Sequence, residues 1–157
     1  MRKCLIIISF LCFGGLCLCH AQNTEMVDTC TNESINCREY HLYMQLKGHD
    51  FTGICVMNIL SEKNIIGTIM NEFGVKAFDF TFNDGKTKVF HVIGPLNKWY
   101  IRKILRKDFS FILSGIRQGR NLVQKKRTLS FQPDGEIRVK NNMYKICYTF
   151  TPMNSKL

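Results

Sequence analysis

Apolar and polar residues alternate along much of this chain, with the two-residue period of strands whose faces meet different surroundings. The alternation is clearest over residues 76–82, where one side is aromatic and the other carries small or polar residues. The first side holds Lys76, Phe78, Phe80 and Phe82, and the second holds Ala77, Asp79 and Thr81. Residues 39–60 and 65–82 are rich in aromatic and β-branched side chains and therefore predict several strands.

Short glycine-containing segments divide these strands. Gly48-His49-Asp50 predicts a bend within 39–60, and residues 71–74 predict a turn. Asp84-Gly85 predicts the centre of a hairpin, because a positive φ suits glycine and is tolerated by aspartate. The returning strand is expected over 87–94, with His91 in its middle, and later strands are expected over 128–132, 136–140 and 143–150.

The period changes over residues 98–113, where apolar side chains recur at helical spacing and lysines and arginines occupy the opposite side. Asn97 is expected to cap this helix and Gly115 to end it, before a basic connector over 116–127. Strands, one amphipathic helix and then strands predict an antiparallel α+β fold, because helices and strands do not alternate.

The first 21 residues are expected to be a secretory signal peptide. Two cations precede an apolar run too short to span a bilayer, and the small residue Ala21 suits cleavage after it. A lipoprotein signal is disfavoured, because each candidate cysteine, Cys12, Cys17 and Cys19, follows a leucine and not a small residue. Export leaves a polar leader over 22–37, with a short helix expected near Glu33, and a single domain over 38–157.

The net charge and the cysteine spacing restrict which partners, disulfides and metal sites are expected. The chain carries a net charge of +10, and export makes nucleic acid the weakest of the anionic partners that such basicity allows. Export leaves Cys30, Cys37, Cys55 and Cys147, for which free buried thiols and bridging are equal alternatives. Cys30 and Cys37 are the candidate disulfide, and Cys55 and Cys147 have the pattern of strand interior residues. The spacing matches no metal site, and neither a metal nor another cofactor is expected.

Two groups of residues could form binding surfaces. Large apolar side chains on the strand faces are either ordinary core or the lining of a site for acyl chains: Met57, Met70, Phe73, Phe78, Phe80, Phe82, Tyr144, Tyr148 and Phe150. Side chains of the helix are either a solvated surface or a contact for an anionic membrane or a partner: Trp99, Arg102, Lys103, Arg106 and Lys107.

No catalytic motif stands out, and the chain is not expected to be an enzyme. Asp79 is an acid on a largely apolar strand, and His91 is expected to be a structural residue of the next strand. A hydrolase site assembled in space around these two residues is retained as a third hypothesis.

Residues 51–105 resemble the lipoprotein-localisation carriers and receptors of Gram-negative envelopes, the LolA/LolB-like superfamily. The shared pattern is Gly53-Ile54 in a first strand, a turn at Glu72-Phe73-Gly74, the apolar strand 77–80, a hairpin and a helix. The resemblance implies a periplasmic protein with a strongly curved, open half-barrel sheet, whose concave side packs on the main helix and takes acyl chains.

The expected function is therefore binding of lipid or lipoprotein acyl chains by an exported monomer, in lipid or lipoprotein transfer across the periplasm. The alternative is a non-enzymatic envelope module that uses the basic helix face to contact an anionic surface or partner.

Overall fold

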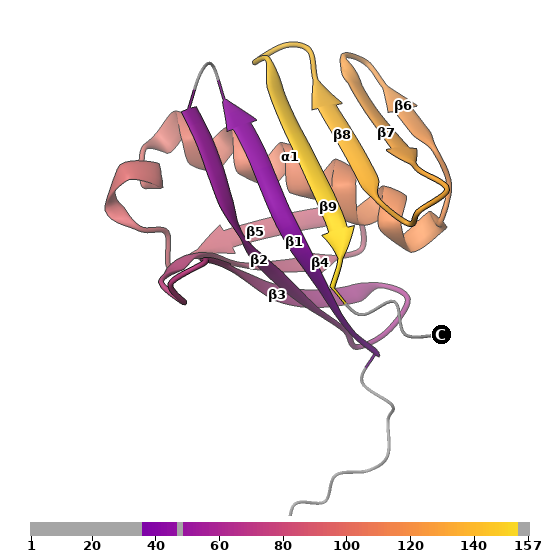
Figure 1. Cartoon of the computed structure of the whole chain (residues 1–157), viewed down its shortest axis with the longest axis horizontal. Helices are drawn as coiled ribbons and strands as arrows, with labels where there is room; N and C mark the ends of the chain where they lie inside the picture. Colours follow the sequence, from indigo (N-terminus) through magenta and orange to yellow (C-terminus); the bar gives the residue numbers. More distant parts are fainter. Residues whose placement is uncertain (1–35, 47–48, 154–157) are drawn as a thin grey trace, which may run out of the picture. The chain divides into compact units, whose positions relative to one another are not determined.

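A computed structural model describes residues 36–46 and 49–153, which form one antiparallel sheet and one main helix (Figure 1). The predicted antiparallel α+β fold is therefore confirmed at this level. The nine strands are β1 Asn36–Leu46, β2 His49–Ile59, β3 Asn64–Asn71, β4 Lys76–Asn83, β5 Lys86–Phe90, β6 Leu122–Gln124, β7 Arg127–Phe131, β8 Ile137–Asn141 and β9 Ile146–Pro152.

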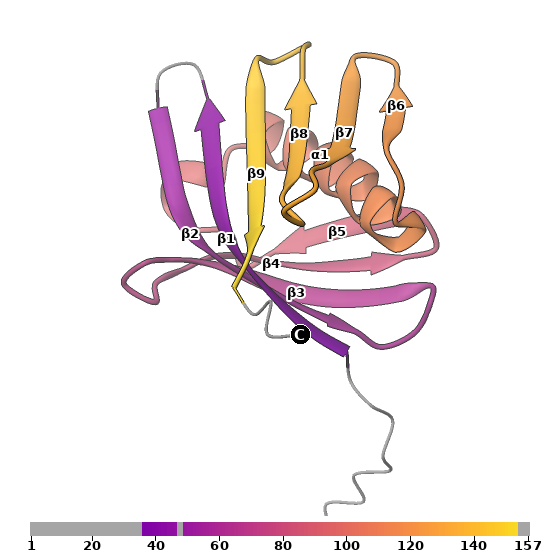
Figure 2. The same cartoon turned by 45° about the vertical axis from the view of Figure 1, so that its right-hand side comes forward.

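The sheet has two edges and does not close on itself. Its strand order is β5-β4-β3-β2-β1-β9-β8-β7-β6, so the first and last strands of the chain pair in the middle and β5 and β6 form the edges. Figure 2 shows β3, β4 and β5 running across the direction of β7, β8 and β9, with the long strands β1 and β2 joining the two halves.

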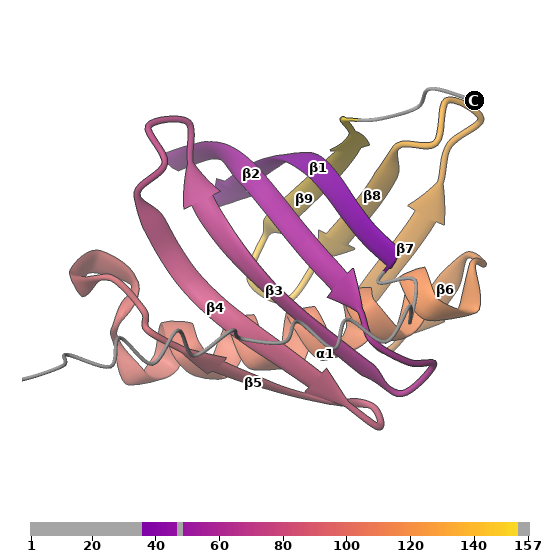
Figure 3. The same ribbon diagram turned by 90° about the horizontal axis from the view of Figure 1, so that it is seen from below.

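The helix α1, Trp99–Gln118, connects the two edge strands and lies against one face of the sheet. The chain reaches it from β5 through the short 3-10 helix η1, Gly94–Leu96, and leaves it directly for β6. Figure 3 shows the helix extending along β5 and past β6 and β7. None of the helices in residues 36–46 and 49–153 combines the length and apolar character that a bilayer span requires.

Strand register explains why one face of the sheet is apolar. Leu42 of β1 lies opposite Phe150 of β9, and Ile69 of β3 lies opposite Phe78 of β4. All four side chains are buried. Because residues opposite each other share a face, this register gathers the apolar positions of the strands into one surface beneath α1.

The strand β5 is shorter than the sequence pattern predicts. It ends at Phe90, and His91 takes a left-handed backbone conformation with φ of +49°. A positive φ cannot continue a strand, so the expectation of a strand over 87–94 with His91 in its middle is wrong. The turn moves the histidine side chain to the surface.

Both predicted ends of the helix are wrong. Lys98, and not Asn97, is the residue before its first turn, and the helix continues past Gly115 to a left-handed Gly119 with φ of +59°. Gly115 is buried, and a β-carbon there would lie 2.6 Å from Cδ1 of Leu129. This glycine therefore permits close approach of α1 to β7 and does not terminate the helix.

The predicted basic connector over 116–127 contains the end of the helix and the edge strand β6. A strand of three residues is too short for a periodic pattern, and β6 is recognisable only from its pairing of Leu122 with Leu129 of β7. The three later strands that the sequence predicts correspond to β7, β8 and β9.

Several sequence-based expectations concern residues outside the described ranges. These are the signal peptide with cleavage after Ala21, the short helix near Glu33 and the position of Cys30, all of which stay predictions. The strand β1 begins at Asn36, so it includes the last two residues of the expected leader.

Gly67 of β3 provides a test of how closely the sheet packs. A β-carbon at this position would overlap Cζ of Phe80 and would lie 2.5 Å from the carbonyl oxygen of Val56. We expect Gly67→Ala to lower the free energy of unfolding by about 1–3 kcal/mol, because a rigid backbone atom cannot move aside. Urea denaturation followed by circular dichroism measures this difference.

Gly94→Ala is the matched control, because a β-carbon there would meet no atom within 4 Å. It should change the free energy of unfolding by less than about 1 kcal/mol. Equal effects of the two substitutions would contradict the packing at Gly67.

Candidate functional site

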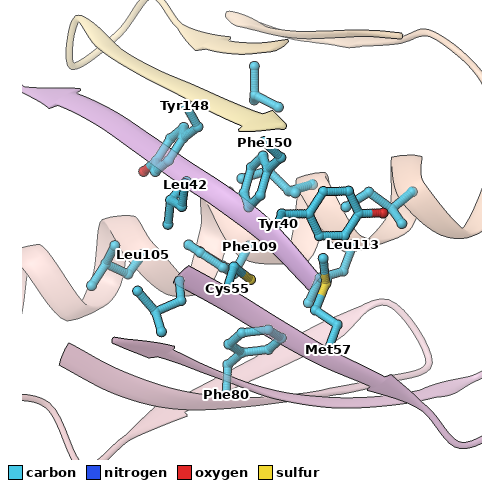
Figure 4. Packing of buried hydrophobic residues seen from close by; sticks show 14 of the residues in the cluster. Tyr40, Leu42, Cys55, Met57, Phe80, Leu105, Phe109, Leu113, Tyr148 and Phe150 are labelled. Atoms are coloured by element: carbon cyan, nitrogen blue, oxygen red, sulfur yellow. The ribbon is translucent and has the colours of Figure 1, made fainter. Parts of the chain in front are cut away.

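Six of the nine predicted acyl-binding residues lie together on the face of the sheet that α1 covers. Each is at most 2 % exposed, and Figure 4 shows several of them around the helix. They come from strands on both sides of the sheet's centre and comprise Met57, Phe78, Phe80, Phe82, Tyr148 and Phe150. We call this group, with the side chains of α1 that pack on it, the apolar interior.

The other three predicted residues are not fully buried, although Tyr144 packs against the core that contains this group. Met70 and Tyr144 are half-buried, and Tyr144 occupies the turn before β9. Phe73 is 90 % exposed at the tip of the turn between β3 and β4, so it does not line the apolar interior. The sequence could not separate these cases, because exposure of an aromatic turn residue depends on what packs above it.

Side chains of α1 fill the space above the strands. The ring of Phe109 lies 5.3 Å from the ring of Phe78, 5.2 Å from Phe80 and 6.2 Å from Tyr148, measured between centroids. These separations are those of close aromatic packing. A ligand could therefore occupy the apolar interior only if α1 moved away from the sheet.

A buried carboxylate fixes α1 in place. Asp108 is 1 % exposed and accepts hydrogen bonds from Arg127 Nε at 2.6 Å, Tyr148 Oη at 2.8 Å and Asn141 Nδ2 at 2.8 Å. The three donors lie on β7, β9 and β8. A buried charge that is paired and hydrogen-bonded in this way is costly to disturb, because loss of one partner leaves the others unsatisfied.

The Tyr148 hydroxyl is held in its neutral form. Burial raises its pKa well above the usual value, and the adjacent Asp108 carboxylate raises it further. The hydroxyl thus remains a donor to Asp108 at all physiological pH values. The sequence pattern does not predict this network, although Asp108 is the one acid between residues 99 and 118 and lies among apolar positions of the helix.

A basic groove runs along the outer side of α1, between the helix and the two edge strands. Its volume is about 1080 Å³, and no aspartate or glutamate occurs among the described residues that line it. The cationic residues of the groove come from β5, α1 and the region of β6 and β7: Lys86, Lys88, Lys103, Arg106, Lys107, Arg120, Lys125 and Arg127. Within the described chain, only Arg127 of this set forms an ion pair.

The five residues of the predicted helix contact surface do not all lie in the groove. Lys103, Arg106 and Lys107 line the groove. Arg102 turns to β5 and donates from Nη2 to the carbonyl oxygen of Val89 at 3.4 Å. Trp99 is 75 % exposed, and it begins the helix one turn before Lys103.

The helix also covers the backbone of edge strand β5. Ser110 Oγ accepts a hydrogen bond from the backbone N–H of Thr87 at 2.9 Å and donates one to the carbonyl of Arg106 at 2.8 Å. With the contact from Arg102, this satisfies edge groups that could otherwise pair with another chain.

Asp79, Lys76 and His91 form a second polar cluster on the sheet face opposite the apolar interior. Asp79 Oδ2 lies 3.0 Å from Lys76 Nζ and 2.7 Å from His91 Nδ1. Burial alone would raise the pKa of Asp79, but the neighbouring Thr68, His91 and Lys76 favour the ionised form and lower it overall. Among the described residues, His91 makes its only side-chain hydrogen bond to Asp79, so no hydroxyl or thiol nucleophile is bonded to it.

The described cysteines are not bridged to one another. Cys55 is fully buried in β2, Cys147 is half-buried in β9, and Cys37 is exposed near the start of β1. Burial raises the pKa of the Cys55 thiol, which makes it a poor nucleophile. The expected bridge from Cys37 to Cys30 stays a prediction, because Cys30 lies outside the described residues.

These features define an α+β protein with an open nine-stranded sheet, one covering helix and a basic groove beside it. No family model matches the chain, and no curated protein matches it. The resemblance to lipoprotein-localisation proteins thus stays an interpretation of the sequence pattern.

The role of Asp108 can be tested by Asp108→Asn. Loss of the charge opposite Arg127 should lower the free energy of unfolding by about 3 kcal/mol. Urea denaturation gives the difference, with Asp84→Asn in the exposed hairpin turn as control, where the change should be within about 0.5 kcal/mol. A Asp108→Asn protein as stable as the wild type would show that the network does not hold the helix.

Asp79 should give the protein a stability that depends on pH. Its pKa in the folded protein lies below the value of about 3.9 expected when unfolded, so its stabilisation is present above pH ~4. That stabilisation is lost as pH falls through the folded pKa. We expect the stability difference between wild type and Asp79→Asn to shrink as the pH falls below ~4, measured by urea denaturation at each pH. A difference that grows on acidification would contradict the direction of the shift.

Proposed function

We propose that this protein is exported to the periplasm of a Gram-negative envelope and holds acyl chains of lipids or lipoproteins in its apolar interior. In this proposal the open sheet acts as a curved half-barrel, and α1 acts as its cover. The observation that carries the proposal is the apolar interior itself, in which residues from β2, β4 and β9 present methionine and aromatic side chains toward one helix. Methionine and aromatic linings suit flexible apolar ligands.

The bound state requires displacement of α1. The helix buries six apolar side chains, which at about 2 kcal/mol each contribute roughly 12 kcal/mol: Leu105, Phe109, Phe111, Ile112, Leu113 and Ile116. An acyl chain of about 15 methylene groups recovers roughly the same amount at ~0.8 kcal/mol per group. The two apolar terms are similar in size, and displacement of α1 in addition breaks the hydrogen bonds of Asp108, so the closed arrangement is favoured when no acyl chain is bound.

The contacts that hold α1 are few and local. On the β5 side they include the Ser110 hydroxyl, and on the β7 to β9 side they centre on Asp108. Separation of the helix from the sheet thus breaks a small number of polar contacts in addition to apolar packing. This arrangement supports a helix that opens as a unit.

The alternative, an envelope module without a ligand in its interior, is favoured by the basic groove. It differs from acyl-chain binding in one measurable respect, because it does not require α1 to move. An experiment that locks the helix therefore separates the two.

A disulfide between α1 and β5 would provide that lock. Ser110 Oγ accepts a hydrogen bond from the backbone N–H of Thr87 at 2.9 Å, so the two residues are in contact, and the mass of the oxidised protein verifies that the bridge between cysteines at these positions has formed. We expect the oxidised Thr87→Cys/Ser110→Cys protein to take up no palmitate, and the reduced protein to take it up as the wild type does. Uptake of radiolabelled palmitate, followed by native mass spectrometry, measures this.

The background and the controls make the result specific. Cys30, Cys37 and Cys147 are replaced by serine, whereas buried Cys55 is retained. Ser110→Cys alone should bind equally with and without oxidant. Equal uptake by the oxidised and reduced double variant, or no lipid bound to wild-type protein purified after export, would overturn the proposal.

A further inference from the structure

The basic groove has the composition of a site for an anionic group. Of its cationic residues, Lys86 and Lys88 lie on β5, Lys103 and Lys107 on α1, and Lys125 beside β6. All five are exposed, and none forms an ion pair with a described residue. Cations held on three sides of one groove repel each other, and an anion placed between them would relieve that repulsion.

The side of α1 that lines this groove continues to an exposed tryptophan at the start of the helix. One stripe of α1 consists of positions spaced three or four residues apart, which therefore share one side of the helix: 99, 103, 107, 110, 114 and 118. Trp99 begins this stripe and is 75 % exposed, and its neighbour Tyr100 is 46 % exposed. Tryptophan and tyrosine favour the boundary between a membrane and water.

Exposed apolar side chains distinguish a membrane from a soluble polyanion. Val123 of β6 lines the groove and is 75 % exposed. Trp99, at the start of α1, is equally exposed. A soluble polyanion offers these side chains no apolar environment, whereas the interfacial region of a bilayer does. Cations flanked by exposed apolar side chains thus fit anionic headgroups better than a free polyanion.

We infer that the groove between β5, α1 and β6 binds the anionic phosphate headgroups of a membrane surface, with Trp99 inserted at the interface. This inference goes beyond acyl-chain binding, because it concerns the outer side of α1 and does not require the apolar interior to open. It assigns a ligand class to Lys86, Lys88 and Lys125, which lie outside the helix.

Trp99 provides the measurement, because it is the only tryptophan of the chain. Vesicles of phosphatidylcholine with roughly 30 % phosphatidylglycerol should shift its fluorescence to shorter wavelength, and high salt should reverse the binding. Lys103→Gln/Lys107→Gln should weaken binding about fivefold per lysine, or about 30-fold in total. Pure phosphatidylcholine vesicles should give no shift.

Lys140→Gln/Lys145→Gln is the matched control, because both lysines are exposed and lie outside the groove. It removes the same charge and should weaken binding less than about threefold. Wild-type affinity in the Lys103→Gln/Lys107→Gln protein, or an equal shift with pure phosphatidylcholine, would overturn the inference. Preferential binding of inorganic polyphosphate without a shift of Trp99 fluorescence would assign the groove to a soluble polyanion instead.

The oxidised Thr87→Cys/Ser110→Cys protein separates this inference from acyl-chain binding. Its helix remains against β5, so it should bind the anionic vesicles as the reduced protein does. Vesicle binding that persists in the oxidised form while palmitate uptake is lost would show that headgroup binding does not require α1 to leave the sheet. Loss of vesicle binding in both forms, with palmitate uptake by the reduced form intact, would overturn this inference alone.

Discussion

The hydrogen bonds of Asp108 determine how the single helix sits on the sheet. Apolar packing alone is not directional, so many rotations of an amphipathic helix would bury a similar area. The carboxylate accepts from donors on β7, β8 and β9, and only one rotation and one axial position of α1 satisfy all three. With that position fixed, Phe109 reaches the rings of Phe78 and Phe80, and Lys103 and Lys107 face outward.

The same constraint explains how an open sheet tolerates two free edges. The helix connects β5 to β6 and lies between them, so its polar side chains reach the backbone of β5 while its basic side chains share a groove with both edges. Lysines at an edge also repel other strands. Protection of the edges and formation of the basic groove are thus consequences of one position of α1.

Much of this architecture could be predicted from local patterns, because periodicity reports which face of an element is buried. The alternation over 76–82, the hairpin at Asp84-Gly85 and the helical spacing after residue 98 all correspond to observed elements. What could not be predicted depends on tertiary contacts. Gly115 resembles a helix stop until Leu129 packs against it, and β6 exists only through its pairing with β7.

The candidate site also combines features that the local sequence pattern predicts with features that depend on tertiary contacts. Aromatic residues of β4 and β9 could be identified from alternation, but their burial under Phe109 depends on where α1 lies. The groove is formed by β5, α1 and β6 together, so in the proposed function its occupancy and the displacement of α1 by an acyl chain are thermodynamically linked. An anion that contacts all three elements stabilises the closed arrangement, whereas a surface that contacts α1 alone does not oppose opening. The position of one helix therefore controls both sides of the molecule.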